Sequence, residues 1–401
     1  MKRRILIINN APKPLPPVEG GAVETLIQLI IDDCPDNIDL TVACVKSEKA
    51  MEASVKYPNV TFKYLDFRNW LYLIQLYCYY IFNHYLHIDI GNALCNLVRR
   101  NLNLNDYDII ISENGVRLGK SLRKVFKGKI ILHLHNDWLN VHTKFAKLYK
   151  QSYDEIWTIS KFLEQRVEQI PGTTNVRVFY NSVDQSVFCP QSDETKHRVR
   201  TKYKIDDKDI VLASCSRVVE EKGVLETIQV FKQLQQTMPD KQLKLLVIGA
   251  VSEKDKYQKL CIDSANKDVV FTGYVNHEEL PAIMGCADIG IAPTIHKKKC
   301  CKSGIYRGFF ESFCLTVVEF LSLGTPVICT NSGGMPEILE HDFPSHIVSA
   351  NEDDFSNSLL NALKNVIENK DAIRKDKLLS VARRFSKQSY ITRFKQYVEE
   401  L

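Results

Sequence analysis

The sequence lacks a hydrophobic segment long enough to cross a membrane. The longest apolar run, Trp70 to Phe82, is shorter than the roughly 20 residues that a spanning helix needs. Near the amino terminus the run Ile5 to Ile8 ends at two asparagines, well short of the core of a signal peptide. We therefore expect a cytosolic protein.

Excess charge and cysteine motifs are also missing. Lys and Arg outnumber Asp and Glu by only 53 to 48, which is too small a difference to indicate a nucleic-acid-binding protein. The 12 cysteines are scattered and no spacing suits zinc, since Cys300 and Cys301 are adjacent and do not form CxxC. We expect reduced, mostly buried thiols.

Short apolar segments that alternate with amphipathic ones fill the 401 residues. This length favours two domains of roughly 200 residues each. We predict strands in the first half at RRILIINN, DLTVACV, VTFKYL, YDIIIS, KIILHLH, EIWTIS and VRVFYN. The second half continues with DIVLASCS, LKLLVIGA, VVFTGYV, ADIGIAPT, TPVICT and HIVS. Strands alternating with helices indicate parallel sheets built from βαβ units.

A polar stretch, NSVDQSVFCPQSDETKHR, interrupts this alternation and predicts a boundary between domains 1–183 and 184–384. The final segment, about 385–401, has helical spacing of its apolar residues, and we expect it to pack back on the first domain. Open α/β sheets bind ligands beyond the carboxyl ends of their strands. A ligand held between the two domains is therefore expected.

Two acids, Glu311 and Glu319, enclose the apolar segment ESFCLTVVE. The pattern predicts a helix from about Leu315 to Gly324, whose free N–H groups attract phosphate. The acids would repel a diphosphate, so we expect them to accept hydrogen bonds from sugar hydroxyls. On spacing alone an equal alternative is one acid favoured by the helix dipole and one solvated acid.

Three further segments carry the same kind of signal. SGGMPEIL places two glycines directly before a predicted helix, and PVEGGAVETL repeats the arrangement between the first strand and helix. CSRVVEEKGV follows a strand and carries Arg217 and Lys222, which are long enough to hold a phosphate. Each segment alone is weak, since a glycine pair before a helix is most often only a turn.

Together and in this order, these segments resemble the GT-B glycosyltransferases of family 4, the retaining nucleotide-sugar enzymes. The resemblance covers nearly the whole chain and includes GGAVE, HLHND, the SK of TISKF, YNSVDQSVF, FTGYV and GTPVICTNSGGMPEIL. It implies an α/β fold of the GT-B type, with two Rossmann-like doubly wound domains facing each other across a cleft. Domain 1–183 would bind the acceptor and domain 184–384 the nucleotide-sugar donor.

The resemblance assigns Arg217 and Lys222 to the donor diphosphate, where they would act as leaving-group catalysts. It assigns Glu319 to the ribose and Glu311 to the transferred sugar. His135, the second histidine of HLHND, matches the histidine near the anomeric centre. The other donor-binding positions that it implies are Gly20, Gly21, Tyr274, Val275, Phe313, Cys314 and Leu315.

Three features around these positions carry further expectations. The family usually has glycine where this chain has Ser312 and Cys314, and Cys314 therefore adds a side chain at a point of close backbone approach. His133 is expected to face the opposite side of its strand and to be structural. The Asp-x-Asp pattern at 106–108 precedes a strand, so we interpret it as a turn, and neither a metal nor another cofactor is expected.

The resemblance implies a UDP-sugar donor, retention by attack on the face from which the diphosphate leaves, and a saccharide acceptor. The acceptor domain contains an aromatic segment, Phe67 to Ile88, and a basic one, Lys120 to Lys129. They predict either a surface that rests on an acidic membrane or a buried helix whose tyrosine hydroxyls reach water. For the basic segment Ile295 to Phe310, a solvated insertion is favoured over contact with acidic lipid or acceptor phosphate.

The expected reaction is transfer of a hexose to a lipid-linked saccharide in bacterial cell-surface polysaccharide or glycoconjugate biosynthesis, in the cytoplasm or on the inner face of the cell membrane. Two alternatives stay open. A nucleotide-sugar epimerase would release UDP without an acceptor, although the aromatic segment argues mildly against it. A non-catalytic binding subunit would saturate with UDP-sugar without releasing UDP, and the retained charged residues argue against it.

Overall fold

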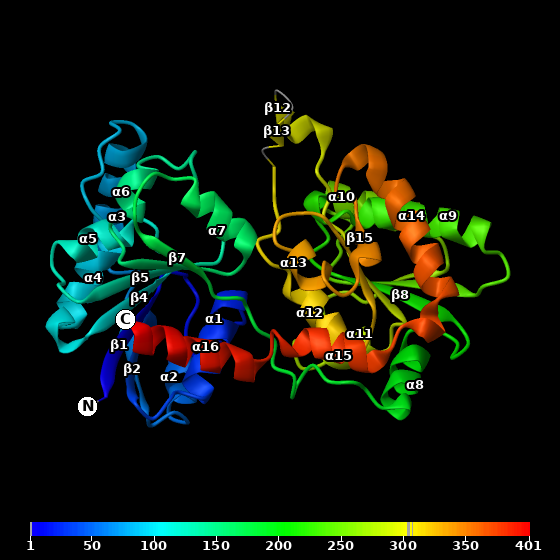
Figure 1. Ribbon diagram of the computed structural model, residues 1–401, viewed down its shortest axis with the longest axis horizontal. Coiled ribbons are helices and arrows are strands. Elements are labelled where there is room, and N and C mark those ends of the chain that lie inside the picture. Colours follow the sequence, from blue (N-terminus) through cyan, green and yellow to red (C-terminus); the bar gives the residue numbers. More distant parts are fainter. Residues whose placement is uncertain (1, 303–304, 307) are drawn as a thin grey trace. The chain divides into compact units, whose positions relative to one another are not determined.

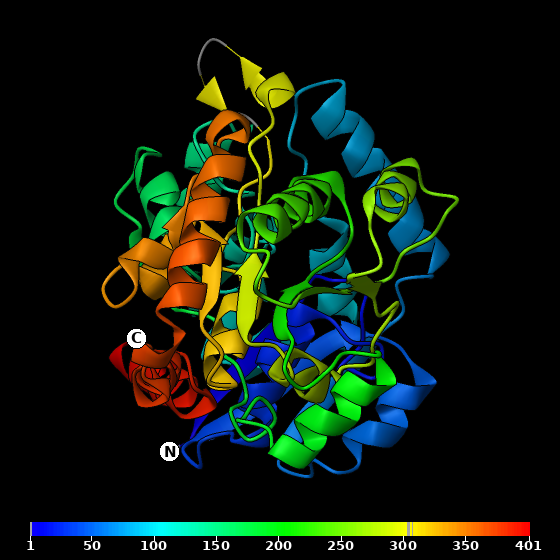
Figure 2. The ribbon, with the colours of Figure 1, turned by 90° about the vertical axis from the view of Figure 1, so that its right-hand side faces the viewer.

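The computed structural model describes residues 2–302, 305–306 and 308–401. The chain forms two compact units (Figures 1 and 2). The first contains the residues up to Asn181 together with Tyr390–Leu401, and the second contains Ser182–Ser389.

The first unit is built on a parallel seven-stranded sheet in the order β3-β2-β1-β4-β5-β6-β7. Its strands are β1 Arg3–Asn9, β2 Ile38–Val45, β3 Val60–Leu65, β4 Ile109–Glu113, β5 Lys129–Leu134, β6 Glu155–Thr158 and β7 Asn175–Val178. Alternate residues of β1 enter two separate hydrophobic clusters, with Ile5 and Ile7 in one and Leu6 and Ile8 in the other. The sheet is therefore covered on both faces, which explains why its strands are almost continuously apolar.

Helices and short 3₁₀ turns connect these strands. They are α1 Ala22–Asp32, α2 Glu48–Ser54, α3 Trp70–His84, α4 Ala93–Asn101, η1 Leu104–Asp106, α5 Leu118–Arg123, α6 Ala146–Lys150, α7 Lys161–Glu168 and, at the end of the chain, α16 Lys387–Glu400. Helix α16 buries Tyr390, Phe394 and Val398 in the cluster that contains Trp157 and Phe179. It thereby completes the core of the first unit.

The second unit has a parallel six-stranded sheet in the order β10-β9-β8-β11-β14-β15. The strands are β8 Ile210–Cys215, β9 Leu243–Ile248, β10 Val269–Phe271, β11 Ile289–Ala292, β14 Val327–Thr330 and β15 Ile347–Val348. A separate antiparallel pair joins β12 Cys301–Lys302 to β13 Ile305–Tyr306. The helices are α8 Asp193–Lys202, η2 Glu220–Lys222, α9 Val224–Thr237, α10 Lys256–Ser264, α11 Leu280–Gly285, η3 Lys298–Cys300, α12 Leu315–Ser322, α13 Pro336–Leu339, η4 Pro344–His346, α14 Glu352–Glu368, η5 Lys370–Ala372 and α15 Lys375–Arg383.

Two Rossmann-like units with parallel sheets confirm the predicted fold class. Each predicted strand segment overlaps an observed strand of one of the two sheets. Among the described residues, no helix combines the length and apolar character needed to cross a membrane.

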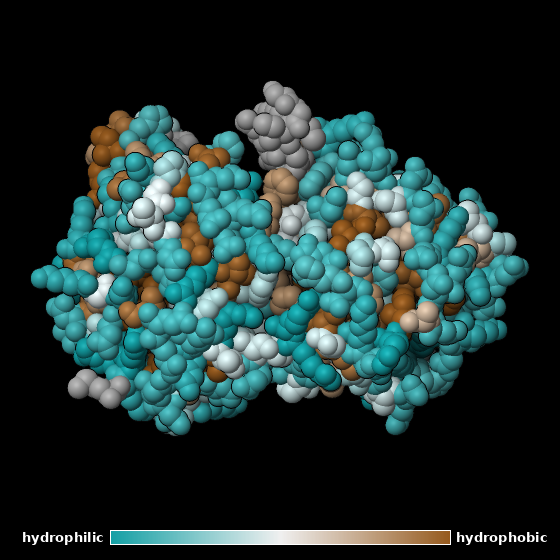
Figure 3. Space-filling view, in the orientation of Figure 1, coloured by the Kyte–Doolittle hydropathy of each residue, from teal (hydrophilic) through white to brown (hydrophobic). Residues whose placement is uncertain are grey.

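The aromatic helix α3 is not buried, so the buried-helix alternative is wrong. Its outer residues Leu73, Ile74, Leu76 and Tyr77 are exposed, with Tyr77 at 66%. Figure 3 shows hydrophobic side chains gathered at the upper left of the first unit, where Figure 1 places α3. The helix is stabilised at its start by Asn69, whose side chain accepts hydrogen bonds from two backbone N–H groups of the first turn.

The lysines that begin the basic segment Ile295–Phe310 are paired within the second unit. Lys297 forms an ion pair with Glu226, Lys298 lies 2.7 Å from Asp353 and Lys299 lies 2.6 Å from Glu220. These contacts fit the favoured interpretation, a surface insertion. The part of this prediction that falls on residues 303–304 and 307 lies outside the described residues.

Candidate active site

The segments predicted to hold the donor follow neighbouring strands of the second sheet. Arg217 follows β8, Glu311 lies in the chain after β11, and Gly333 follows β14. These three strands are adjacent and parallel. Their carboxyl ends therefore bring the loops together at one edge of the sheet.

Lys222 and Glu311 form an ion pair at this edge. Glu311 is 8% exposed, and the ammonium group of Lys222 also lies 5.1 Å from the centre of the Phe309 ring. Burial lowers the pKa of Lys222, and the nearby charge of Arg217 lowers it further. Arg217 itself is exposed. The edge thus contains one shielded cation in contact with a carboxylate and one cation accessible to solvent.

Helix α12 begins where the sequence predicts, at Leu315. The preceding residue, Cys314, has φ 80° and ψ 84°, in the left-handed region that favours glycine. Phe313 is buried against Phe385, with ring centres 5.4 Å apart. Thr316 donates a hydrogen bond of 3.4 Å to the carbonyl of Cys215, and this contact joins the start of the helix to the end of β8.

Glu319 lies in the second turn of α12 and is half-buried. Burial raises the pKa of its carboxyl to about 7. Its negative charge in turn raises the pKa of Cys215, after the larger effect of burial. Glu319 is therefore poised between its protonated and ionised forms near neutral pH.

Tyr274 and Val275 lie elsewhere on the same sheet. They follow β10, an edge strand separated from β8 by β9. Tyr274 is 79% exposed, so its ring is accessible to a ligand. Among the described residues, no hydrogen bond, ion pair or ring contact joins this pair to Lys222 or Glu311.

The glycine pair of the first unit lies directly before α1. Gly20 and Gly21 have φ values of 65° and 132°, and a Cβ on Gly21 would overlap the carboxylate of Glu24. Glu24 is buried and accepts a hydrogen bond of 3.0 Å from the side chain of Asn9. The turn therefore requires glycine at position 21.

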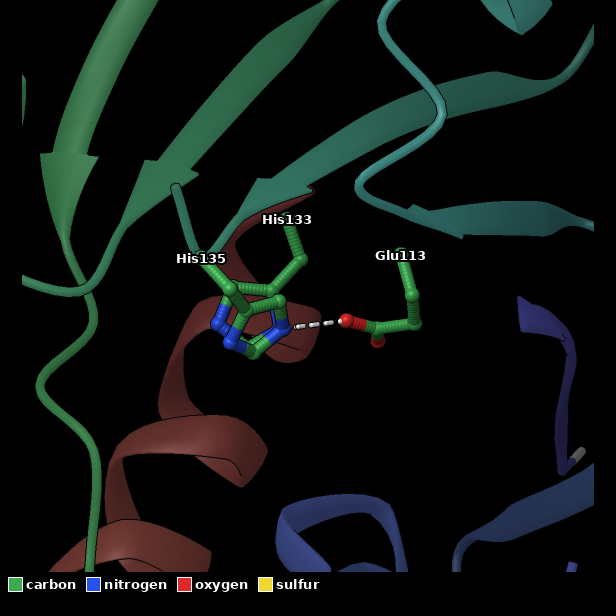
Figure 4. A group of neighbouring side chains, drawn as sticks. All are labelled: Glu113, His133 and His135. Atoms are coloured by element: carbon green, nitrogen blue, oxygen red, sulfur yellow. Dashed lines mark hydrogen bonds and ion pairs between the residues drawn. The ribbon is translucent and has the colours of Figure 1, made fainter. Parts of the chain in front are cut away.

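His135 belongs to a buried group with His133 and Glu113 (Figure 4). One carboxylate oxygen of Glu113, at the end of β4, lies 2.7 Å from His135 Nε2 and 3.0 Å from His133 Nδ1. The expectation that His133 faces the other side of its strand is wrong. Residues two positions apart on a strand share a face, and the two imidazole rings lie 4.0 Å apart.

The charge states in this group follow from its burial. Desolvation disfavours an ionised Glu113, but the two histidines outweigh it and lower its pKa to about 2. Burial and the neighbouring His133 lower the pKa of His135 to about 4. At neutral pH Glu113 is therefore a carboxylate that accepts an N–H from a neutral His135.

The ligand atoms of Glu113, His133 and His135 also lie within 4.8 Å of one another, close enough to share a metal ion. A histidine that binds a metal almost always donates its other ring N–H to a carboxylate, carbonyl or water. Here the other ring nitrogens, His133 Nε2 and His135 Nδ1, are buried without a hydrogen-bond partner among the described residues. The arrangement fits two imidazoles that share a carboxylate better than a metal centre.

The Asp-x-Asp pattern at 106–108 lies before β4, at the amino end of the first sheet. Asp108 accepts a hydrogen bond of 2.9 Å from the backbone of Arg4 and pairs with its side chain. The segment is thus a connection between strands.

Comparison with known proteins adds the family. The sequence pattern of the glycosyl transferases group 1 matches residues 195–378. A lipopolysaccharide 1,2-N-acetylglucosaminetransferase of Salmonella typhimurium is 22% identical over 371 residues, 89% of this chain and 87% of its own. The chain is a glycosyltransferase, and its second unit carries the group 1 pattern. A putative glycosyltransferase of Bacillus subtilis, YtcC, is 23% identical over 84% of this chain and 77% of its own.

Solved structures place the glycosyltransferase in the GT-B fold. HepE of Anabaena, in complex with UDP, superimposes with a TM-score of 0.71 at 18% identity over 100% of both chains. Sucrose-phosphate synthase of Thermosynechococcus elongatus also gives 0.71, at 14% identity over 100% of both chains.

Sequence reasoning missed one residue of this glycosyltransferase that contacts a predicted site residue directly. Glu113 ends the apolar run IIISE and lies opposite His133 in the parallel register of β4 and β5. An acid that ends a buried strand was the available signal. This signal does not identify the residue that Glu113 contacts, because the contact depends on how β4 and β5 align.

Proposed function

We propose that this enzyme transfers a hexose, with retention of configuration, from a UDP-sugar to a lipid-linked saccharide in bacterial cell-surface polysaccharide or glycoconjugate biosynthesis. The observation that carries the proposal is the contact between Lys222 and Glu311 beside the start of α12. It combines a phosphate-binding cation with an acceptor for sugar hydroxyls. HepE, which shares the fold, binds UDP, and the Salmonella relative acts on lipopolysaccharide.

Departure of the diphosphate is assigned to Arg217 and Lys222. Fixed cations stabilise the charge that develops on a leaving group without reorganising during the reaction. An incoming diphosphate competes with Glu311 for the ammonium group of Lys222, and this frees carboxylate oxygens for the sugar. The cations take the place of a metal ion in this proposal, so we expect turnover to persist in EDTA.

The remaining donor contacts are assigned within each unit. Glu319 would accept hydrogen bonds from the ribose, Tyr274 and Val275 would line the base, and the backbone of Phe313, Cys314 and Leu315 would contact phosphate and sugar. In the first unit, Gly20 and Gly21 would approach the diphosphate and His135 would orient the transferred sugar.

Retention follows from attack on the face from which UDP departs. The bond between the anomeric carbon and the diphosphate oxygen breaks as the bond to the acceptor oxygen forms. The released diphosphate oxygen takes the acceptor proton, and no enzyme carboxylate is needed as a nucleophile. Glu311 and His135 position the sugar during this exchange.

Peripheral contact with the inner face of the cell membrane is part of the proposal. The exposed apolar face of α3 would enter the interface, and exposed basic residues between Lys120 and Lys129 would lie near anionic headgroups. Co-sedimentation with phosphatidylglycerol vesicles, but not with phosphatidylcholine vesicles, is the expected result. Equal recovery with both lipids, or with neither, would contradict this part.

The decisive experiment measures UDP release from a panel of UDP-sugars with and without membrane extract. We expect one sugar to give release that depends on the extract, and Lys222→Met to reduce it at least tenfold. Lys299→Met, which removes an exposed ion pair with Glu220, is the matched control and should change little. Release without extract would instead indicate the epimerase, and binding of UDP- or GDP-sugars without turnover would indicate a binding subunit.

A further inference from the structure

Two adjoining cavities lie in the first unit beside the carboxyl ends of β1 and β4. One has a volume of about 250 Å³ and the other about 300 Å³. Asn10, Asn92 and Arg117 line both cavities. Because they share these walls, the two can hold different parts of one ligand.

The first cavity has a buried carboxylate in its wall. The side chain of Asp89 is 5% exposed, and its Oδ1 accepts a hydrogen bond of 3.0 Å from the backbone of Gly91. Its Oδ2 is buried, with the ammonium group of Lys120 3.4 Å away and the hydroxyl of Tyr149 near the carboxylate, but no described group makes a well-aligned hydrogen bond to it. An ionised carboxylate only accepts hydrogen bonds, and leaving such an oxygen unsatisfied is costly. The cavity therefore presents an acceptor to a ligand that donates.

The charge around Asp89 favours a ligand whose hydrogen-bond donors are uncharged. Lys120 Nζ lies 3.4 Å from Asp89 Oδ2 and donates to the Asp89 carbonyl at 2.8 Å. Because this ammonium group already balances the carboxylate, the ligand need not be a cation. Hydroxyl groups meet the requirement, and the amides of Asn10 and Asn92 can both donate to and accept from them.

Another part of the lining of this cavity is largely apolar. Tyr72, Leu76, Tyr79 and Tyr80 of α3 line it, and Leu76 and Tyr80 are also exposed to solvent, at 49% and 53%. The wall therefore continues onto the exposed face of α3. A ligand with hydroxyl groups at one end and a hydrocarbon at the other matches both walls.

The second cavity leads toward a residue already assigned to the reaction. Asn114 lines it together with Trp138, and the Asn114 side chain accepts a hydrogen bond of 2.8 Å from the backbone N–H of His135. Trp138 is 56% exposed and offers a ring against which a sugar can pack. The polar end of the ligand thus lies toward His135 and the apolar end toward α3.

We propose that these cavities form the acceptor site, in which Asp89 accepts hydrogen bonds from a saccharide whose hydrocarbon chain runs along α3. This inference rests on the proposed transferase function and adds to it the residues that select an amphipathic acceptor. Asp89 is a specificity-determining residue for the acceptor and is not assigned to the donor.

Binding of alkyl glycosides to the full chain tests this site without turnover. The probes are the octyl and methyl β-glycosides of glucose, galactose and N-acetylglucosamine, followed by saturation-transfer NMR and calorimetry below the micelle concentration. We expect at least one octyl glycoside to bind, and Asp89→Asn to weaken it at least tenfold. The asparagine keeps an oxygen for the Gly91 N–H. Asp66→Asn is the control, because Asp66 accepts the same kind of hydrogen bond, from Arg68 at 2.9 Å, away from both cavities.

A second variant tests the hydrocarbon end. Leu76→Ser should reduce the advantage of the octyl over the methyl glycoside, whereas Leu260→Ser, at an exposed leucine of α10, should leave it unchanged. Equal binding to wild type and Asp89→Asn, or no octyl glycoside bound at all, overturns the site. UDP titrated in parallel separates the two proposals: if UDP does not bind while the glycosides do, the donor assignment fails and the saccharide site stands.

Discussion

The backbone N–H of Gly334 donates a hydrogen bond of 2.8 Å to the carbonyl oxygen of Glu311. This bond joins the loop after β11 to the turn after β14. The neighbouring Gly333 has φ 58°, and a Cβ there would overlap the backbone of Glu311. The glycine turn therefore fixes the position of the carboxylate that contacts Lys222.

Gly333→Ala tests this close approach. We expect it to lower the free energy of unfolding by about 3 kcal/mol, because it adds steric overlap to the cost of a left-handed alanine. Gly273→Ala is the matched control, since Gly273 has φ 74° but no atom of the described residues, its chain neighbours aside, within 4 Å of its Cβ position. It should cost only about 1 kcal/mol. Urea denaturation measures both, and equal losses would show that contact with Glu311 is unimportant.

At position 314 glycine should be more stabilising than alanine, which is the reverse of their usual order. The φ of 80° at Cys314 strains any residue with a Cβ, so Cys314→Gly should be more stable than Cys314→Ala by about 1 kcal/mol. Both variants remove the thiol, and their difference isolates the backbone. Thermal and urea denaturation provide the comparison. An alanine variant as stable as the glycine variant would contradict the expectation.

Glu319 should make stability depend on pH. Its pKa is about 7 in the folded protein against 4.5 for an ordinary glutamate, so between these values the folded state retains a proton that the unfolded chain has released. Stability therefore falls as pH rises through this window. Relative to Glu319→Gln, wild type should lose about 3 kcal/mol between pH 4.5 and pH 8.

Unfolding of both proteins in urea at several pH values measures this difference. Glu368→Gln, at an exposed residue of α14, is the control and should follow wild type throughout. A constant difference between wild type and Glu319→Gln across the window would show that Glu319 does not titrate there.

Glu113 should stabilise the end of β5 through both histidines. Glu113→Ala leaves two buried imidazole N–H groups without an acceptor, and we expect a loss of about 3 kcal/mol in the free energy of unfolding. Glu113→Gln retains an acceptor oxygen and should recover about half of it. Denaturation at pH 7 compares the two. Identical losses would mean that the negative charge, which both variants lack, matters and that the acceptor oxygen kept by glutamine does not.

Most of the fold was predictable because most of the strands are buried on both faces. Such strands appear as short apolar runs between polar segments, and segments such as RRILIINN and DIVLASCS coincide with β1 and β8. The start of α12 at Leu315 was also predictable. Cys314 stands where the family usually has glycine, and its left-handed backbone conformation explains why glycine is preferred at this position.

The sequence did not predict side-chain pairings between elements. The contact of Glu113 with His133 and His135 depends on the register of β4 and β5. His133 lies on the same side as His135 because residues two positions apart on a strand share a face. Composition also could not distinguish an exposed apolar helix from a buried one, because both contain similar residues. The exposed face of α3 and the buried carboxylate of Asp89 became evident only from packing.

The contribution of α16 to the first core has a consequence for synthesis on the ribosome. Tyr390, Phe394 and Val398 cover Trp157 and Phe179, yet they are translated after the whole of the second unit. The second unit can therefore finish folding first, while Trp157 and Phe179 stay uncovered in the nascent chain. A ribosome that stalls before residue 390 would release a chain with an incomplete core and an exposed aromatic surface open to chaperones and proteases.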